Sequence, residues 1–253
     1  MRDFVVDSFN LIYKIRGLEG GVARNFFNQL YFKAQRFKPD RWFLLFDSKP
    51  TEKRKIDETY KQNRGDVYDS LAGDVDDIVR LARVFPNVHV VQHEGFESDD
   101  IAYNLCRTLE RPIVWSDDID WIVNFTVNPN VTWIRNKKLY TRMNFTGSFG
   151  FSFEKIPLYL FLLGDSKDSV SKPFRLKGPI EESVLHHADI ADYLKKNNLT
   201  REEVSHYCDL LFPLKMKTLK TQEGIKTADS VKLAKQFRCD HFYKTLLKER
   251  KMI

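Results

Sequence analysis

Acidic side chains recur in this 253-residue sequence where buried strands should end or helices should begin. Asp7 and Asp47 each close a short apolar run, and three further groups follow at 97–100, 116–120 and 164–168. In an open parallel sheet, ligands bind beyond the carboxyl ends of the strands, which meet at one edge. We therefore expect nine carboxylates to share one patch, namely Asp7, Asp47, Glu97, Asp99, Asp100, Asp118, Asp120, Asp165 and Asp168.

Such a patch needs counter-charges, because like charges a few ångströms apart raise each other's pKa. A single acid such as Asp99 or Asp165 is commonly a helix cap, but five groups that end strands or open helices indicate a shared site. Ligation by carboxylate oxygens alone suits Mg²⁺ or Mn²⁺. Two such ions roughly 4 Å apart support phosphodiester cleavage without a Ser or His nucleophile.

The charge balance points to a polyanionic partner. The chain has 41 Lys+Arg and 35 Asp+Glu, a net charge of +6 and a pI near 9.0. When the nine acids are left out, 26 Asp+Glu remain against 41 Lys+Arg, so the rest of the chain is strongly cationic. An anionic pocket inside a cationic shell is typical of an enzyme that cuts a phosphate backbone.

Other classes are excluded. No apolar run approaches the roughly 18 residues of a membrane span, and the acids near the N-terminus come too early for a signal peptide. Cys106, Cys208 and Cys239 form no CxxC pair, so neither a zinc site nor a disulfide framework is indicated. The six histidines show no metal-ligand spacing.

The elements that must position these acids alternate between strands and helices. Apolar runs predict strands over 4–6, 42–46, 88–91, 113–115 and 131–134, with helices over 22–37, 75–85 and 99–109 between them. After Phe153 the strand signal ends, and the chain predicts helices over 156–163, 180–196, 202–211 and 228–251. This pattern indicates one compact α/β unit with a mostly parallel sheet flanked by helices and a helical C-terminal part.

The connection 48–73 is unusually long and rich in cations. Connections of this length are usually either functional or disordered. A solvated basic loop is the simpler alternative.

The ordered motifs are similar to those of a known family. Asp7, Phe46-Asp47, the segment 60–64 (Tyr-Lys-Gln-Asn-Arg), 97–100 (Glu-Ser-Asp-Asp), Ser116-x-Asp118-x-Asp120 and Gly164-Asp165-x-x-Asp168 resemble the 5′-nuclease (flap endonuclease) superfamily. The resemblance covers residues 1–170 and favours the bacteriophage branch, which includes the phage enzyme called ribonuclease H. It implies a PIN-like nuclease core over 1–170, a helical arch over 48–73, and a helical duplex-binding part over 171–253.

The resemblance also implies roles. The first metal group matches Asp7, Asp47, Glu97 and Asp99; the second matches Asp118, Asp120, Asp165 and Asp168; Asp100 matches a further phage-branch acid. The cofactor would be Mg²⁺, two ions per site, with Mn²⁺ as a substitute. Lys61 and Arg64 would contact the scissile phosphate, and Arg54 and Tyr60 the nucleic acid. Asp117 has no assigned role.

The sequence departs from the family after the last motif. Most members carry a glycine-rich hairpin there, which grips duplex DNA and often a potassium ion, whereas 169–179 contains one glycine. Lys172, Arg175 and Lys177 could hold phosphates by charge instead. The tail 213–253 has 11 Lys+Arg and 4 Asp+Glu, and it could extend the DNA track, dock a replication protein or be an ordinary solvated helix face.

We therefore expect a divalent-metal-dependent 5′-3′ exonuclease or flap endonuclease acting on DNA and RNA·DNA with 5′ ends or flaps. It would remove primers in phage DNA replication, as a monomer in the cytoplasm of the infected host and away from membranes. A single-stranded-DNA-binding protein or a sliding clamp would be its partner. One alternative is a haloacid-dehalogenase-type phosphatase, although Asp7-Ser8-Phe9 lacks the Asp-x-Asp of that class. The other is a non-catalytic nucleic-acid-binding protein on a nuclease fold.

Overall fold

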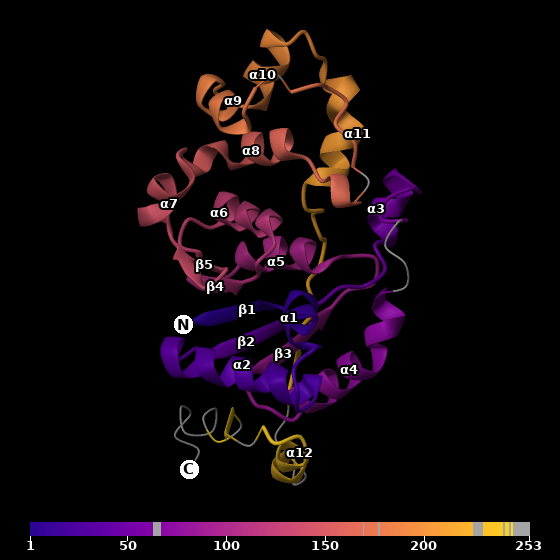
Figure 1. Ribbon diagram of the computed structural model, residues 1–253, viewed down its shortest axis with the longest axis vertical. Coiled ribbons are helices and arrows are strands. Elements are labelled where there is room, and N and C mark those ends of the chain that lie inside the picture. Colours follow the sequence, from indigo (N-terminus) through magenta and orange to yellow (C-terminus); the bar gives the residue numbers. More distant parts are fainter. Residues whose placement is uncertain are drawn as a thin grey trace.

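The computed structural model describes residues 1–62, 67–168, 170–176, 178–224, 230–239, 241–242 and 244, without the side chains of 67–69 and 231. Within them, one sheet runs through the middle of the molecule in the order β6-β5-β4-β1-β2-β3-β7 (Figure 1). Its strands are β1 (Asp3–Asp7), β2 (Arg41–Phe46), β3 (Val88–Gln92), β4 (Pro112–Trp115), β5 (Thr132–Arg135), β6 (Lys138–Tyr140) and β7 (Gln222–Glu223). The five strands from β5 to β3 are parallel, and β6 and β7 are antiparallel edges.

Helices cover both faces of the sheet (Figure 1). One face carries α1 (Ser8–Ile15), α2 (Val22–Phe37), α4 (Val67–Ala82) and α12 (Ser230–Gln236). The other carries α5 (Ser98–Cys106), α6 (Asn124–Val127), α7 (Arg142–Phe149) and α8 (Ile156–Leu163), and beyond them stand α9 (Ile180–His186), α10 (Ile190–Lys196) and α11 (Arg201–Leu211). The short α3 (Thr51–Ile56) packs against α11.

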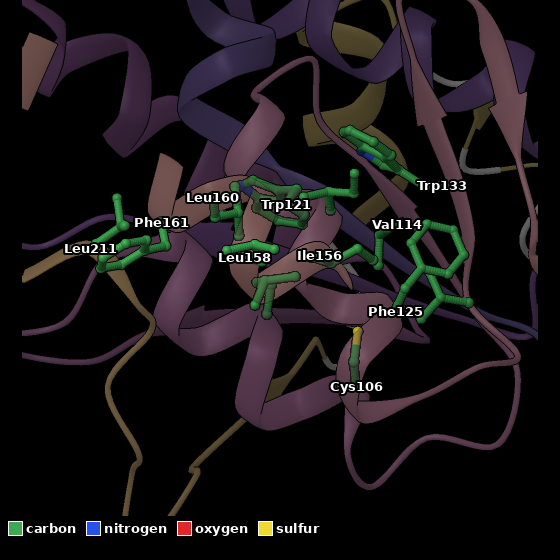
Figure 2. Close-up of a cluster of buried hydrophobic side chains, with 14 of the residues drawn as sticks. Cys106, Val114, Trp121, Phe125, Trp133, Ile156, Leu158, Leu160, Phe161 and Leu211 are labelled. Carbon is green, nitrogen blue, oxygen red and sulfur yellow. The ribbon is translucent and has the colours of Figure 1, made fainter. Parts of the chain in front are cut away.

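The strands are hydrophobic throughout because both faces are buried. Val5 faces the α5–α8 side, while its neighbours Phe4 and Val6 face the α1–α4 side. Because successive side chains of a strand point to opposite faces, β1 contributes to two separate hydrophobic cores. In the first core, Trp121, Leu158 and Leu160 pack against one another between sheet and helices (Figure 2). This packing holds α8 and the strand ends in fixed positions.

The predicted fold class is confirmed, and so are all five predicted strands, within a residue or two at each end. Helices 22–37 and 156–163 also have the predicted bounds. Helix α4 begins at Val67, eight residues earlier than expected, so part of the long 48–73 connection is helical. The predicted helix 228–251 is not continuous, because among the described residues α12 ends at Gln236 and a turn follows, with Arg238 at φ +52°.

Two further predictions were wrong. The expected helix 180–196 is two helices, because the Asp189 side chain accepts the backbone N–H of Asp192 and starts a new helix there. The expectation of no strand after Phe153 fails at β7, whose two polar residues pair with β3 and carry no hydrophobic signal. Among the described residues, no helix is long and apolar enough to cross a membrane.

The strand order places the site. From β1 the chain moves to β2 and β3 on one side, and then to β4 on the other side of β1. Asp7, the last residue of β1, therefore lies where the order reverses, and ligands of open α/β sheets bind at such points.

Candidate active site

A pocket of 130 Å³ opens at the carboxyl ends of the parallel strands. Its lining brings together acids that lie up to 161 positions apart in the sequence, from Asp7 to Asp168. Eight of the nine predicted acids line it: Asp7, Asp47, Glu97, Asp99, Asp118, Asp120, Asp165 and Asp168. The predicted convergence of these eight residues is therefore present in the structure.

One wall of the pocket is built around Asp7. Its Oδ1 accepts the backbone N–H of Asn10 at 3.0 Å, which caps α1, and its Oδ2 accepts the Ser116 hydroxyl at 2.6 Å. Ser116 Oγ in turn accepts the backbone N–H of Asp118 at 3.1 Å. The turn after β4 thus places Asp118 next to Asp7.

The wall beside Asp47 is formed by the start of α5. Asp47 Oδ1 accepts the Ser98 N–H at 2.6 Å, which ties the end of β2 to this helix. Glu97 is the N-cap residue, and Asp100 closes the first turn by accepting the Glu97 N–H at 3.1 Å. Asp100 also accepts the Leu214 N–H at 2.7 Å and is fully buried behind the pocket wall.

The opposite side comes from the end of α8. Gly164 ends this helix with φ +67°, and a Cβ there would meet Lys172 Cε at 2.7 Å and Tyr207 Oη at 2.9 Å. Glycine is required on both counts. The backbone then turns so that Asp165 Oδ1 accepts the Asp168 N–H at 3.3 Å, and both carboxylates face the pocket.

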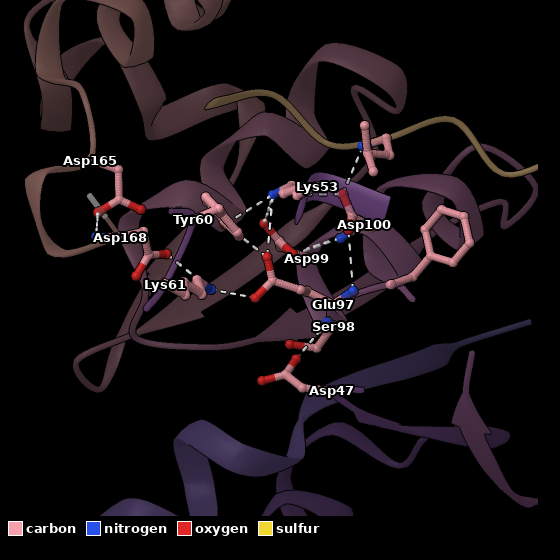
Figure 3. Close-up of polar contacts among 12 residues, drawn as sticks. Asp47, Lys53, Tyr60, Lys61, Glu97, Ser98, Asp99, Asp100, Asp165 and Asp168 are labelled. Carbon is pink, nitrogen blue, oxygen red and sulfur yellow. Dashed lines mark hydrogen bonds and ion pairs between the residues drawn. The ribbon is translucent and has the colours of Figure 1, made fainter. Parts of the chain in front are cut away.

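Two lysines point into this acidic pocket (Figure 3). Lys61 forms a close ion pair with Glu97 and a second one with Asp168 at 2.9 Å. Lys53, on α3, lies 3.4 Å from Glu97 Oε2. The hydroxyl of buried Tyr60 donates to Glu97 Oε2 at 2.8 Å. Tyr60 therefore holds a predicted metal ligand in place and presents no free ring for stacking on a base.

The pKa values of the pocket carboxylates shift in opposite directions. Burial and the charge of Asp47 raise the pKa of Asp7 to about 7, and burial and the charge of Glu97 raise that of Asp47 to about 6. Burial and the charge of Asp118 raise the pKa of Asp120 to about 8. Burial also acts on Glu97, but Lys61 and Lys53 outweigh it and lower its pKa to about 2.

The pocket fits divalent cations. Carboxylate oxygens are its main donor groups, as hard cations require. Burial and neighbouring carboxylates raise the pKa values of Asp7, Asp47 and Asp120, and a bound cation would offset the repulsion between these groups. Within the described residues, one carboxylate oxygen from each of Glu97, Asp99 and Asp100 lies within 4.8 Å of the other two.

Other predicted site residues lie around this pocket. Half-buried Arg54 donates through Nε to the Tyr60 carbonyl at 3.2 Å, so it supports the turn that carries Tyr60. Lys172 packs over Gly164, and Arg175 is exposed on the following loop. Arg64 and Lys177 lie outside the described residues.

Three further residues, for which no role was predicted from the sequence, have defined positions in the structure. Asp117 points away from the carboxylate cluster, forms an ion pair with Lys14 and accepts the Asn136 N–H at 2.7 Å, so it anchors the turn after β4. Lys53 and Ser116 contact the acids directly. The sequence does not distinguish Lys53 from the other cations of the basic segment 48–73. Ser116 belongs to the Ser116-x-Asp118-x-Asp120 motif, but the motif does not show that it contacts Asp7.

Comparison with known proteins gives a consistent result. The family model described as "5′-3′ exonuclease, N-terminal resolvase-like domain" matches residues 2–150. A DNA polymerase I of Caldicellulosiruptor bescii is 26% identical over 156 residues, which are 57% of this chain and 18% of the relative. A 5′-3′ exonuclease of Aquifex aeolicus is 23% identical over 182 residues, which are 66% of this chain and 63% of the relative. The chain thus spans less than two thirds of the length of either relative.

Solved structures share the fold over nearly the whole chain. The phage T5 D15 protein co-crystallised with metal ions has a TM-score of 0.67 at 15% identity, covering 98% of this chain and 99% of that one. The T5 D15 flap endonuclease in a pseudo-enzyme-product complex with DNA and metal ions has a TM-score of 0.68 at 15% identity. The match covers 99% of this chain and 100% of that one. Human GEN1 in complex with Holliday junction DNA has a TM-score of 0.58 at 12% identity, and the match covers 99% of this chain and 72% of that one. At these identities the likeness establishes a shared fold.

Proposed function

This chain belongs to the 5′-3′ exonuclease family with an N-terminal resolvase-like domain, within the 5′-nuclease superfamily, and on that premise we propose that it is a divalent-metal-dependent nuclease. Its substrates would be DNA and RNA·DNA duplexes with 5′ ends or flaps. The observation that carries the proposal is the pocket in which eight carboxylates from four strand ends and α8 converge beside Lys61.

The residues proposed to hold the ions fall into two groups. Asp7, Asp47, Glu97 and Asp99 would hold one Mg²⁺, and Asp118, Asp120, Asp165 and Asp168 would hold the second. Two divalent ions held there would supply Lewis-acid chemistry, activating a water and stabilising the leaving oxygen of the phosphodiester. Mn²⁺ would serve in place of Mg²⁺, because the donor set is the same oxygen type.

Other side chains would contact the phosphate or hold the carboxylates in position. Lys61 lines the pocket at the end of a flexible four-carbon stem, so its ammonium can turn from Glu97 and Asp168 to a phosphoryl oxygen. Arg64, three residues further on, is proposed to contact the same phosphate. Ser116 and Tyr60 keep Asp7 and Glu97 oriented through the hydrogen bonds described above.

Duplex binding is proposed for the part that follows α8. In this division 1–170 is the nuclease core, with 48–73 as its arch, and 171–253 is the duplex-binding and C-terminal part of the same compact unit. Half-buried Lys172 lies against Gly164, the neighbour of Asp165, and exposed Arg175 follows on the same loop before α9. Their positive charge suits a phosphate backbone that must pass the pocket.

The test is digestion of 5′-flap, nicked and RNA·DNA substrates with and without Mg²⁺. We expect products from the 5′ end when Mg²⁺ is present and none in EDTA. Binding without cleavage in Mg²⁺ or Mn²⁺ would instead support a non-catalytic nucleic-acid-binding protein. Membership in an exonuclease family argues against the phosphatase alternative.

The proposal extends to primer and flap removal in phage DNA replication. It rests on the phage-branch pattern of motifs in the sequence. A single-stranded-DNA-binding protein or a sliding clamp is the proposed partner, and the basic segment 213–253 is the proposed contact.

A further inference from the structure

The ammonium of Lys53 lies at the centre of three carboxylates. It is 3.4 Å from Glu97 Oε2, 3.7 Å from Asp99 Oδ2 and 3.9 Å from Asp100 Oδ1. Only 3% of the Lys53 side chain is exposed. A lysine buried this deeply is stable only when its charge is matched by close partners, and here three are supplied.

The same three carboxylates form the acidic group whose spacing suits a metal ion within the described residues. Lys53 points its charge into that group (Figure 3). We propose that Lys53 is a permanent, protein-borne cation that takes the place of a divalent ion in the Glu97–Asp99–Asp100 trio. Lys53 is then a positioning residue, which holds Glu97 and Asp99 ready before any metal arrives.

Asp100 has contacts that fit this assignment. Its two oxygens accept the backbone N–H groups of Glu97, at 3.1 Å, and Leu214, at 2.7 Å. It is fully buried, whereas 24% of the Asp99 side chain is exposed at the pocket. Asp100 therefore anchors the start of α5 to the chain at Leu214, and Glu97 and Asp99 remain to face an incoming ion.

Lys53 and Lys61 differ in how firmly they are held. Lys53 projects from helix α3 and also donates to Tyr60 Oη at 3.4 Å, so a second polar contact fixes its position. Lys61 follows α3 on a turn, with φ +55°, and its side chain is 13% exposed. Its partners Glu97 and Asp168 both line the pocket. Lys53 is the fixed cation, and Lys61 is the one that a metal or a phosphate can displace.

This inference rests on the proposed function only in treating the pocket as a metal site, and its test uses no nuclease activity. Mn²⁺ bound per chain is measured by titration calorimetry for wild type, Lys53→Ala, Lys53→Arg, Asp100→Asn and Lys55→Ala. Lys55 is the matched control, because it lies on the same helix, is 68% exposed and pairs with Glu52 alone among the described acids. Unfolding temperatures are measured in EDTA and in Mn²⁺.

We expect Lys53→Ala to bind one more Mn²⁺ per chain than wild type, since the trio is then open to an ion. In EDTA its unfolding temperature should fall on the order of 10 °C, because buried Glu97 and Asp100 and partly exposed Asp99 lose their shared cation, and Mn²⁺ should restore most of that loss. Lys53→Arg and Lys55→Ala should keep the wild-type Mn²⁺ count. Asp100→Asn should also keep it, since Asp100 is not a ligand in this account.

The proposal is overturned if Lys53→Ala binds the wild-type number of ions, or if Asp100→Asn loses one. If Lys53→Ala does not fold in EDTA, refolding on addition of Mn²⁺ supports the proposal, and failure to refold in Mn²⁺ contradicts it. A wild type that binds Mn²⁺ but cleaves nothing would refute the proposed function and leave this inference standing.

Discussion

Ser116 joins Asp7 to Asp118 across the candidate active site, donating to the first at 2.6 Å and accepting from the backbone of the second at 3.1 Å. The serine is 1% exposed, so it cannot contact substrate itself. It links the carboxylate at the end of β1 to the turn at the end of β4, and in the proposed assignment these belong to different metal groups. Outer hydrogen bonds of this kind commonly change metal affinity or activity 10- to 100-fold when they are removed.

Ser116→Ala should therefore lower both Mn²⁺ affinity and kcat/KM by about 10-fold or more, while the protein stays folded. Ser148→Ala is the control, because the Ser148 hydroxyl also donates a hydrogen bond, to the Asn144 carbonyl at 2.8 Å, but on the exposed surface of α7. Equal effects of the two substitutions, measured by calorimetry and flap cleavage, would show that Ser116 has no special role.

Stability without metal should depend on pH in a specific direction. The pKa values of Asp7, Asp47 and Asp120 are raised in the folded protein to between about 6 and 8, so the folded state binds more protons than the unfolded state between pH 4 and 8. The stability of the metal-free protein must then fall as pH rises through that window.

Glu97 acts in the other direction, because its pKa is lowered to about 2 and its contribution is lost only as pH falls below about 4.5. The unfolding temperature in EDTA should therefore be highest near pH 5 and fall toward pH 8. Each net pKa unit corresponds to about 1.4 kcal/mol, or about 3–5 °C for a chain of this size. Mg²⁺ should raise the unfolding temperature most at pH 8. A metal-free protein that is more stable at pH 8 than at pH 5 would contradict these shifts.

Lys61→Ala should lower kcat more than it raises KM. The proposed contact with the phosphate strengthens as charge develops on the phosphoryl oxygens, and one such contact contributes on the order of 10²-fold. Lys167→Ala is the control, since Lys167 is exposed on the turn between Asp165 and Asp168. A rise in KM alone would make Lys61 a substrate-positioning residue.

Duplex binding should depend on side-chain charge rather than on a glycine-rich hairpin. The loop contains Lys172 and Arg175, and Pro173 between them has no N–H to offer a phosphate. Each cation on a phosphate adds about 0.9 to the slope of log affinity against log salt. The Lys172→Ala, Arg175→Ala double variant should therefore flatten that slope by up to about 1.8.

The experiment is a salt series of duplex affinities, run once in KCl and once in NaCl. We expect the wild type to respond equally to the two salts. A K⁺-specific gain in wild-type affinity, or an unchanged slope in the double variant, would show that a potassium-binding hairpin persists despite its sequence.

Most of the fold and the acidic pocket could be predicted from the sequence, because both depend on short-range patterns. Buried strands read as runs of Val, Ile, Phe and Trp, and an acid directly after such a run must lie at the edge of the sheet. The positions of Asp7 and Asp47 followed from that rule alone. After Trp115 the first acid is Asp117, and only the motif Ser116-x-Asp118-x-Asp120 singled out Asp118.

What could not be predicted depends on contacts between distant segments. Nothing in the sequence separates Lys53, which is buried among three acids, from Lys55, which is exposed two residues later on the same helix. The role of Asp100 likewise depends on Leu214, 114 residues away. The two-residue strand β7 is made by pairing with β3 and has no hydrophobic pattern of its own.

The central claim is that the carboxylates at the strand ends cut phosphodiesters by holding metal ions. The most direct test is single-turnover cleavage of a 5′-flap substrate in Mg²⁺ by wild type, Asp118→Asn, Asp165→Asn and Asp117→Asn, with DNA binding measured in parallel. Asp117 is the matched control, since it neighbours Asp118 but pairs with Lys14 outside the carboxylate cluster. We predict that Asp118→Asn and Asp165→Asn abolish cleavage while DNA binding is retained, and that Asp117→Asn stays within a few-fold of wild type. Substantial cleavage by both Asp118→Asn and Asp165→Asn would contradict the account.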